Sequence, residues 1–448
     1  MRSKFSSICL VLLLLASTQT LFAKAIPKTL VLKAVSENSA EAAPAIAALR
    51  VQGPAGLNEL LKTYAREIDE QVWHPLLAAT PEWRRLSVAL DEVSQQKDSY
   101  LSGLYWYTDF AQAKAAARAA DKPILSLRLL GKLNEEYSCA NSRFFRSVLY
   151  SNAEVSNLLR DKFILYWESE RPAPRVTIDF GDGRKLERTV TGNSIHYVLD
   201  SNGNVIDALP GLYGPAAFMR SLNEMEAVSK YWGKEPVAGD KHQPYWAYQQ
   251  DRLRKITVEW LQDTERIGGK APAGFTVYRD ERGTATAMEV ANRAITKMVT
   301  EASLLQGMTA GPEALGKMTY DVAWNKIAQL HLADAQLDAR SIGLIKRQTQ
   351  SGLLPDQSLL TPDIALKTLI ENLQTNIALD TVRNEYLLHT KLYAWLIADH
   401  QRSELGALNK RVYAELFLTP ASDPWLGLFS PKVYTALEGS GIIRAPKH

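Results

Sequence analysis

The residue best suited to covalent chemistry in this chain is Cys139, in the segment Glu-Glu-Tyr-Ser-Cys-Ala-Asn-Ser-Arg that ends at Arg143. The only other cysteine, Cys9, lies in a segment that we expect to be removed. A dithiol enzyme passes electrons by closing and opening its own disulfide, which a chain with one remaining thiol cannot do alone. The sequence therefore predicts, at most, a monothiol that acts in redox chemistry or thiol capture.

The side chains next to Cys139 are polar: Asn141, Ser142 and Arg143 follow it directly. A cation beside a thiol favours the thiolate, which is the reactive form. We therefore take Cys139, Ser142 and Arg143 as candidate catalytic residues. The alternative is a free, half-buried cysteine that has no function beyond packing.

The N-terminus has the pattern of a secretory signal. Arg2 and Lys4 precede an apolar run over residues 8–16, and Ala23-Lys24-Ala25 offers a small-x-small cleavage site. The alternative is an uncleaved anchor, but no stop-transfer stretch follows. The chain also contains no Asn-x-Ser/Thr sequon, which favours a bacterial periplasm over a glycosylating secretory pathway. The sequence thus predicts an exported, periplasmic protein with a signal peptide over residues 1–25.

Composition narrows the possible partners. The 448 residues include 52 Lys and Arg against 49 Asp and Glu, so the formal net charge is only +3. Such a balance does not favour binding to nucleic acid or to an anionic membrane, and no later segment is apolar enough to span a bilayer. A single thiol also excludes a disulfide-stapled scaffold. We expect no cofactor and no bound metal.

The elements that position Cys139 are predicted from hydrophobic periodicity. Residues of about 40–98 are predicted to be helical. Helices are then predicted at 109–120, 152–160 and 214–229, and strands at 124–130, 163–167, 196–199 and 205–209. This order predicts an α/β domain with a mixed sheet flanked by helices.

The second half of the chain is predicted to be helical. Long helical patterns occur at 284–306, 313–336, 338–350, 362–378, 380–398 and 403–417, and no fixed-period repeat is evident. We therefore predict a helical N-terminal segment at 26–100, the α/β domain at 101–232, a linker and irregular region at 233–283, and an all-α domain at 284–448.

The α/β segment resembles the thioredoxin-like superfamily, and within it the exported or DUF255-type domains. The segments that carry the resemblance are Lys122-Pro123-Ile-Leu before the strand, Cys139-Ala-Asn-Ser142 after it, Phe163-Ile-Leu on the next strand, and Glu170-Arg-Pro172. The later strand–turn–strand, Tyr197 to Ile206, is similar to the family's hairpin, and 209–215 to its exit into the last helix. The resemblance covers about a quarter of the chain. It implies a thioredoxin-like fold.

Two departures from the family pattern bear on activity. The resemblance implies that a second cysteine resolves the mixed disulfide, but Ser142 stands in that position. It also implies a cis-proline opposite the cysteine, whereas the matching residues 191–195 are Thr-Gly-Asn-Ser-Ile. The resemblance therefore implies the fold without dithiol activity. Asn193, Ser194 and His196 are expected to face or adjoin Cys139 from the loop in the cis-proline position.

Other patterns have a structural and a chemical interpretation. Asp179 to Arg184 is expected to be a hairpin turn rather than a calcium loop. Glu168, Glu170 and Arg171 are expected to form an ion-pair network at a strand end. Glu385 and His389 share a helix face, as metal ligands can, but a core histidine or an exposed pair is the preferred interpretation. The segment 420–428, which contains Asp423-Pro424-Trp425, either caps the helical domain, docks on the α/β domain or binds a partner.

Three functional hypotheses follow. The first is an exported thioredoxin-like protein with a monothiol redox or thiol-capture role through Cys139. The second is a non-catalytic binding or assembly module whose helical domain engages another periplasmic or secreted protein. The third is a hydrolase or transferase built on a Cys139–His196 dyad.

Overall fold

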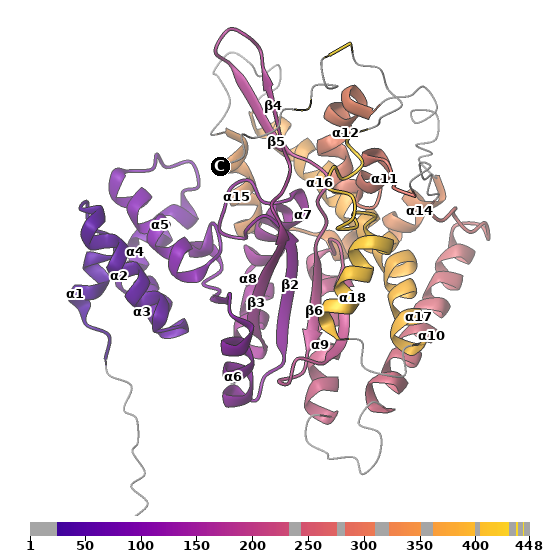
Figure 1. Cartoon of the computed structure of the whole chain (residues 1–448), viewed down its shortest axis with the longest axis horizontal. Coiled ribbons are helices and arrows are strands. Elements are labelled where there is room, and N and C mark those ends of the chain that lie inside the picture. The colour runs from indigo at the N-terminus through magenta and orange to yellow at the C-terminus, as the bar shows by residue number, and fades with distance from the viewer. Residues whose placement is uncertain are drawn as a thin grey trace, which may run out of the picture.

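The computed structural model describes residues 25–232, 243–275, 283–309, 322–350, 362–398, 404–429, 436–437 and 442. Apart from Ala25, the predicted signal peptide and Cys9 lie outside the described residues. Figure 1 shows three regions: a group of helices at the N-terminus, a central sheet, and a larger set of helices packed against that sheet.

The N-terminal region is helical, as the sequence predicts. Its elements are α1 (Lys28–Lys33), α2 (Ser39–Val51), α3 (Pro54–Thr63), α4 (Ala65–Trp73) and α5 (Pro81–Ser94). Asn38 and Thr80 cap α2 and α5 by accepting hydrogen bonds from backbone N–H groups in the first turn. The buried residues of these helices form a core of their own, which also includes the side chain of Leu344 from the distant helix α15 (Ala339–Gln350).

The central sheet has five strands in the order β1-β3-β2-β6-β7. They are β1 (Trp106–Tyr107), β2 (Ile124–Leu130), β3 (Ile164–Arg171), β6 (Ile195–Leu199) and β7 (Val205–Pro210). Strand β3 is parallel to β1 and β2, while β6 is antiparallel to β2 and β7. All seven residues of β2 are buried, because it lies in the middle of the sheet. The predicted mixed sheet is confirmed.

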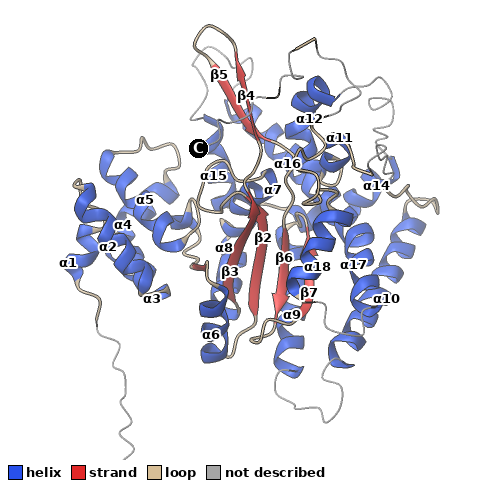
Figure 2. Cartoon of the chain, viewed as in Figure 1, coloured by secondary structure: helices blue, strands red, loops and turns tan. Residues whose placement is uncertain are grey.

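Helices flank this sheet (Figure 2). They are η1 (Ser99–Leu101), α6 (Phe110–Ala120), α7 (Ala140–Phe144), the π-helical turn η2 (Phe145–Tyr150), α8 (Ala153–Lys162) and α9 (Pro215–Trp232). Asp109 and Asn152 cap α6 and α8 by accepting hydrogen bonds from backbone N–H groups. The helices that the sequence predicts at 109–120, 152–160 and 214–229 are therefore confirmed.

A two-stranded hairpin, β4 (Arg175–Asp179) and β5 (Lys185–Thr189), leaves the sheet after β3 and projects from the molecule (Figure 1). Gly181 and Gly183 at its tip have φ values of 76° and 92°, which glycine adopts without steric cost. Asp182 pairs with Arg184 rather than facing a shared oxygen cage. The hairpin turn is confirmed.

The remaining helices form the third region. They are α10 (Gln243–Arg266), α11 (Ala287–Ala291), α12 (Ile295–Thr309), α14 (Val322–Leu330), η3 (Leu332–Ala335), α15 (Ala339–Gln350), α16 (Pro362–Arg383), η4 (Asn384–His389), α17 (Thr390–Ala398), α18 (Leu405–Arg411) and η5 (Val412–Leu416). Helix α10 corrects the prediction of a linker and irregular region over 233–283. This helix has few apolar side chains, and Tyr248, Ile256 and Trp260 stand among charged neighbours. The helix is therefore stabilised mainly by packing on the rest of the protein.

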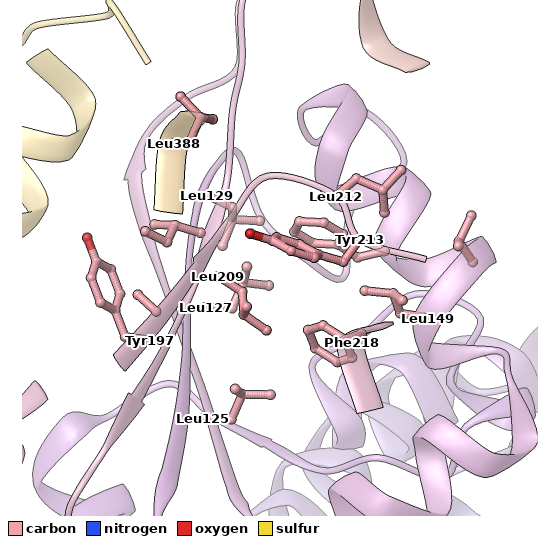
Figure 3. Close-up of a cluster of buried hydrophobic side chains, with 14 of the residues drawn as sticks. Leu125, Leu127, Leu129, Leu149, Tyr197, Leu209, Leu212, Tyr213, Phe218 and Leu388 are labelled. Carbon is pink, nitrogen blue, oxygen red and sulfur yellow. The ribbon is translucent and has the colours of Figure 1, made fainter. Parts of the chain in front are cut away.

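The sheet and the third region share one continuous hydrophobic core. Figure 3 shows Leu125, Leu127 and Leu129 of β2, Leu209 of β7 and Phe218 of α9, with Leu388 of η4 higher in the view. All six of these side chains are buried in the same cluster. The helical residues near 388 therefore complete the core of the sheet.

Candidate functional site

Cys139 lies at the end of the loop that follows β2, where it is the residue before α7. Its backbone N–H donates to the carbonyl oxygen of Leu130, which ties the loop back to the strand. The side chain is only 1% exposed. The sequence predicts a half-buried thiol, but the thiol is almost fully buried, because residues from several segments cover it.

Two hydroxyl groups contact the sulfur. Cys139 Sγ lies 3.1 Å from Oγ of Ser194 and 3.5 Å from Oγ of Ser142. Ser142 also donates a hydrogen bond of 2.8 Å to the carbonyl oxygen of Cys139. The structure thus brings together Cys139, Ser142 and Ser194, as the sequence predicts.

The loop opposite the cysteine is held by a second polar contact. The side-chain amides of Asn141 and Asn193 form a short hydrogen bond, and both residues are buried. The residue before Asn193 is Gly192, where an added Cβ would overlap Cβ of Cys139 and lie 3.5 Å from its Sγ. Position 192 therefore has to be glycine for this loop to reach the thiol so closely.

Arg143 turns toward the hairpin. Its Nη2 donates to Oγ1 of Thr189 at 3.0 Å, and the Thr189 hydroxyl donates to the carbonyl oxygen of Ser138 at 3.2 Å. Burial lowers the pKa of Arg143, while a thiolate at Cys139 and the carboxylate of Glu301 would act against that effect. The guanidinium is thus within electrostatic range of the thiol without being bonded to it.

His196 does not form a dyad with Cys139. It lies on β6, where its Nε2 is 2.6 Å from the hydroxyl of Tyr150, and its ring packs against Phe145 and Phe218. The ring is fully buried, and burial lowers the pKa of His196 to about 3. Because Cys139 Sγ is paired with the two serines, the described residues contain no Cys–His hydrogen bond. The third hypothesis has no geometric support.

Three further residues near the thiol come from the helical region. Lys297 and Glu301 are one turn apart on α12 and are buried, and Tyr413 lies on η5. Burial lowers the pKa of Lys297 and raises that of Tyr413, and a thiolate at Cys139 would raise both. No local pattern in the sequence marks these three residues, because they lie more than 150 residues from Cys139 and belong to no recognisable motif.

These distant residues hold the loop that faces the cysteine. The backbone N–H of Thr191 donates to Oε2 of Glu301 at 3.1 Å, and the Tyr413 hydroxyl donates to the carbonyl oxygen of Asn193 at 3.1 Å. Thr191 has φ of 57°, a left-handed conformation that a β-branched residue adopts only under strain. Burial raises the pKa of Glu301 and lowers that of Lys297, and their mutual attraction opposes both shifts. The helical region therefore stabilises the loop over the thiol.

Replacing Gly192 with alanine is expected to push this loop away from Cys139. The new Cβ overlaps Cys139, so we expect the free energy of unfolding to fall by about 1–3 kcal/mol. Thiol-specific labelling of Cys139 is expected to become faster as the loop moves. The matched control is Gly274→Ala, where an added Cβ meets nothing within 4 Å. Labelling and stability equal to those of the control would contradict this prediction.

A second polar cluster joins β7 to the helices. The Asp207 carboxylate accepts hydrogen bonds from the hydroxyls of Tyr248 and Tyr393 at 2.8 and 2.6 Å, and lies 2.9 Å from Nε2 of His389. The other ring nitrogen of His389 lies 3.1 Å from Glu385. Of the two preferred interpretations, a core histidine or an exposed pair, the core histidine is confirmed, because His389 is fully buried.

The charges of this cluster support one another. Burial alone would lower the pKa of His389, but the carboxylates of Glu385 and Asp207 raise it to about 9. Burial would likewise raise the pKa of both carboxyls, and the imidazolium keeps both below their usual values. The cluster is satisfied within the protein, and among the described residues no group of three or more His, Cys, Asp or Glu side chains could hold a metal ion.

The remaining candidate segments have structural roles. Glu168 and Glu170 pair with Arg128 of β2, while Arg171 donates to the carbonyl oxygen of Thr419 at 2.8 Å. The network expected at this strand end is therefore present, but Arg171 belongs to a contact with the C-terminal segment. Near that contact, an added Cβ at Gly427 would overlap the backbone at 285–287. Residues 419–427 thus contact both regions, while Trp425 remains 44% exposed.

A cavity of about 920 Å³ opens beside the covered thiol. Its lining includes Ala140 and Arg143 of α7 and Thr189 of β5, all adjacent to the residues around Cys139. The opposite wall is the α4–α5 connection, residues 75–79. The cavity therefore lies where the N-terminal helices, the α/β region and the helical region meet.

The fold and the site define a mixed α/β protein with an attached helical region and a buried thiol beside a large cavity. No family model, no curated protein and no solved structure matches the chain. In the part of the chain that the structure describes, no helix is long and apolar enough to cross a membrane.

Proposed function

We propose that this chain is an exported protein with a thioredoxin-like domain that serves as a binding or assembly module rather than as a dithiol oxidoreductase. Support for the thioredoxin-like assignment comes from the strand order, in which the parallel strands β1, β3 and β2 are followed by the antiparallel pair β6 and β7. Further support comes from the position of Cys139, at the end of the loop between the central strand β2 and helix α7. The β4–β5 hairpin is then an insertion between the third and fourth strands of that domain.

One observation supports the non-catalytic role most directly: the Cys139 side chain is 1% exposed. A thiol that exchanges disulfides with a protein partner must be reached by the partner's sulfur. Here Gly192 lies close to the side chain of Cys139, and Glu301 and Tyr413 hold the loop that contains this glycine. We therefore assign Cys139 to the scaffold and the adjoining cavity to binding.

The test is the rate at which a thiol reagent labels Cys139 in the native protein. We expect labelling to be at least about 1,000-fold slower than in the unfolded chain, because it requires local opening of the structure. We expect Cys139→Ser to leave the stability within about 1 kcal/mol of the original value, because serine fills nearly the same volume. Fast labelling of the native protein would contradict the scaffold role.

A second candidate function is supported by the cations near the thiol. Lys297 and Arg143 both lie within electrostatic range of Cys139, and positive charge favours the thiolate. If the loop over Cys139 opens, the monothiol hypothesis applies. It predicts labelling that is fast and reaches its maximum rate well below pH 8.5. The same labelling experiment therefore separates the two candidates.

A further inference from the structure

The cavity beside Cys139 has two chemically different walls. The residues of the α4–α5 connection, 75–79, are Pro-Leu-Leu-Ala-Ala, and Phe144 of α7 adds to this apolar side. Leu76 and Leu77 are 51% and 43% exposed, although they line a concavity. Apolar side chains that stay in contact with water inside a cavity are typical of a surface that a ligand covers.

The rest of the lining is strongly cationic. Five Lys or Arg side chains contribute to it, against two carboxylates, those of Asp98 and Glu136. Both carboxylates are neutralised within the protein, because Asp98 pairs with Arg347 at 2.8 Å and Glu136 with Lys97 at 3.4 Å. The cavity therefore has an excess of positive charge.

Three guanidinium groups of the lining form no ion pair within the part of the chain that is described. Arg146 has a structural role, because its guanidinium donates hydrogen bonds to backbone carbonyl oxygens, among them that of Glu135 at 2.8 Å. Arg143 donates to Thr189, but its Nε is buried without a hydrogen-bond partner. Arg188 is exposed at the base of the hairpin, where its Nη1 donates a hydrogen bond of 3.0 Å to the carbonyl oxygen of its neighbour Glu187. Arg143 and Arg188 are thus available to a ligand.

We propose that this cavity binds a small amphipathic anion, with its acidic head group at Arg143 and Arg188 and its apolar body against residues 75–79. A guanidinium presents paired N–H donors that match a carboxylate or a phosphate. The volume of about 920 Å³ falls within the range of cavities that hold small-molecule ligands. This inference rests on the proposed binding role and names the class of ligand.

The experiment is calorimetric titration of the full-length protein with C10 probes below their micellar concentrations. Decanoate and decyl phosphate differ only in the acidic head group. Decanol and decyltrimethylammonium carry the same chain without the negative charge, and acetate and inorganic phosphate carry the charge without the chain. We expect one or both acidic C10 probes to bind at least about tenfold more tightly than any of the other four.

Variants of exposed residues locate the site. Arg188→Ala is expected to weaken binding of the acidic C10 probe about tenfold, and the double variant Leu76→Ser/Leu77→Ser to weaken it to a similar extent. Arg184→Ala is the matched control, because Arg184 lies on the same hairpin, is 74% exposed in its side chain and does not line the cavity. The Arg184→Ala variant is expected to bind the acidic C10 probe with the same affinity as the original protein.

The proposal is overturned if decanol binds as tightly as decanoate and decyl phosphate, if neither acidic C10 probe binds at about 1 mM, or if both cavity variants bind like the Arg184 control. Failure of the proposed function has a different signature. It would appear as fast labelling of Cys139 in the native protein, whatever the result with the C10 probes.

Discussion

Replacing Asp207 with alanine is expected to lower the free energy of unfolding by about 3–5 kcal/mol, which is the usual cost of removing one partner from a buried charge cluster. Asp207 is fully buried and binds His389 and the hydroxyls of Tyr248 and Tyr393. Without the carboxylate, one buried imidazolium loses a counter-ion and two buried hydroxyls lose their acceptor.

The measurement is equilibrium unfolding in urea at pH 7. Asp182→Ala is the control, because that aspartate lies on the exposed hairpin turn, where its pairing with Arg184 contributes little. Asp207→Asn should fall between the two, since an amide keeps an acceptor oxygen but loses the charge. A loss below about 1 kcal/mol for Asp207→Ala would show that the cluster does not hold the sheet and the helices together.

The second large effect is the dependence of stability on alkaline pH. The pKa of His389 is about 9 in the folded protein, raised by Glu385 and Asp207 against the opposing effect of burial, and close to 6.5 when the chain is unfolded. Between these values the folded state binds a proton that the unfolded state does not. The contribution of this proton to the free energy of unfolding is therefore fully present below about pH 6.5. It is lost as the pH rises through about 9, which lowers the stability by up to about 3 kcal/mol.

This slope is measured from urea unfolding at several pH values between 6 and 9.5. The variant His389→Gln keeps a neutral donor toward Asp207 but cannot take up the proton, so its stability should be lower at pH 6 and should change less with pH. The two curves are expected to converge toward the alkaline end. Parallel curves for the original protein and the variant would contradict the assignment of this titration to His389.

Much of the α/β region can be predicted from local pattern. The run at 124–130 is apolar at most positions and becomes the central strand, and Asp109 and Asn152 signal the starts of α6 and α8. The hairpin follows from the two glycines at 181 and 183. Such features depend on residues close together in the sequence, so single-sequence analysis detects them.

The candidate site can be predicted only in part, for the same reason. Ser142 and Ser194 contact Cys139 as expected, because the order of elements places their segments together. The contributions of Lys297, Glu301 and Tyr413 depend on how α12 and η5 pack on the α/β region, and no local pattern encodes that packing. Burial of the thiol is the result, and it favours the binding module over monothiol chemistry.

Helix α10 shows a related limit. Its 24 residues include few apolar side chains and many charged ones. Such a composition is typical of a solvated linker, which is why the sequence predicts one here. Tyr248 and Ile256 are placed against the rest of the protein by contacts that exist only in the folded state. Weak amphipathic patterns of this kind are decided by tertiary packing rather than by propensity.

The Asp207–His389 pair also determines when the protein can finish folding. The two residues are 182 positions apart, and a ribosome adds about 5–20 residues per second. Asp207, on the end strand β7, is therefore synthesised about 10–40 seconds before its counter-ion His389. During that interval Asp207 lacks His389 and Tyr393, although Tyr248 and helix α9 are already synthesised. Because Leu388 belongs to the same buried cluster as the strands of the sheet, the core of the sheet is complete only when η4 has joined it.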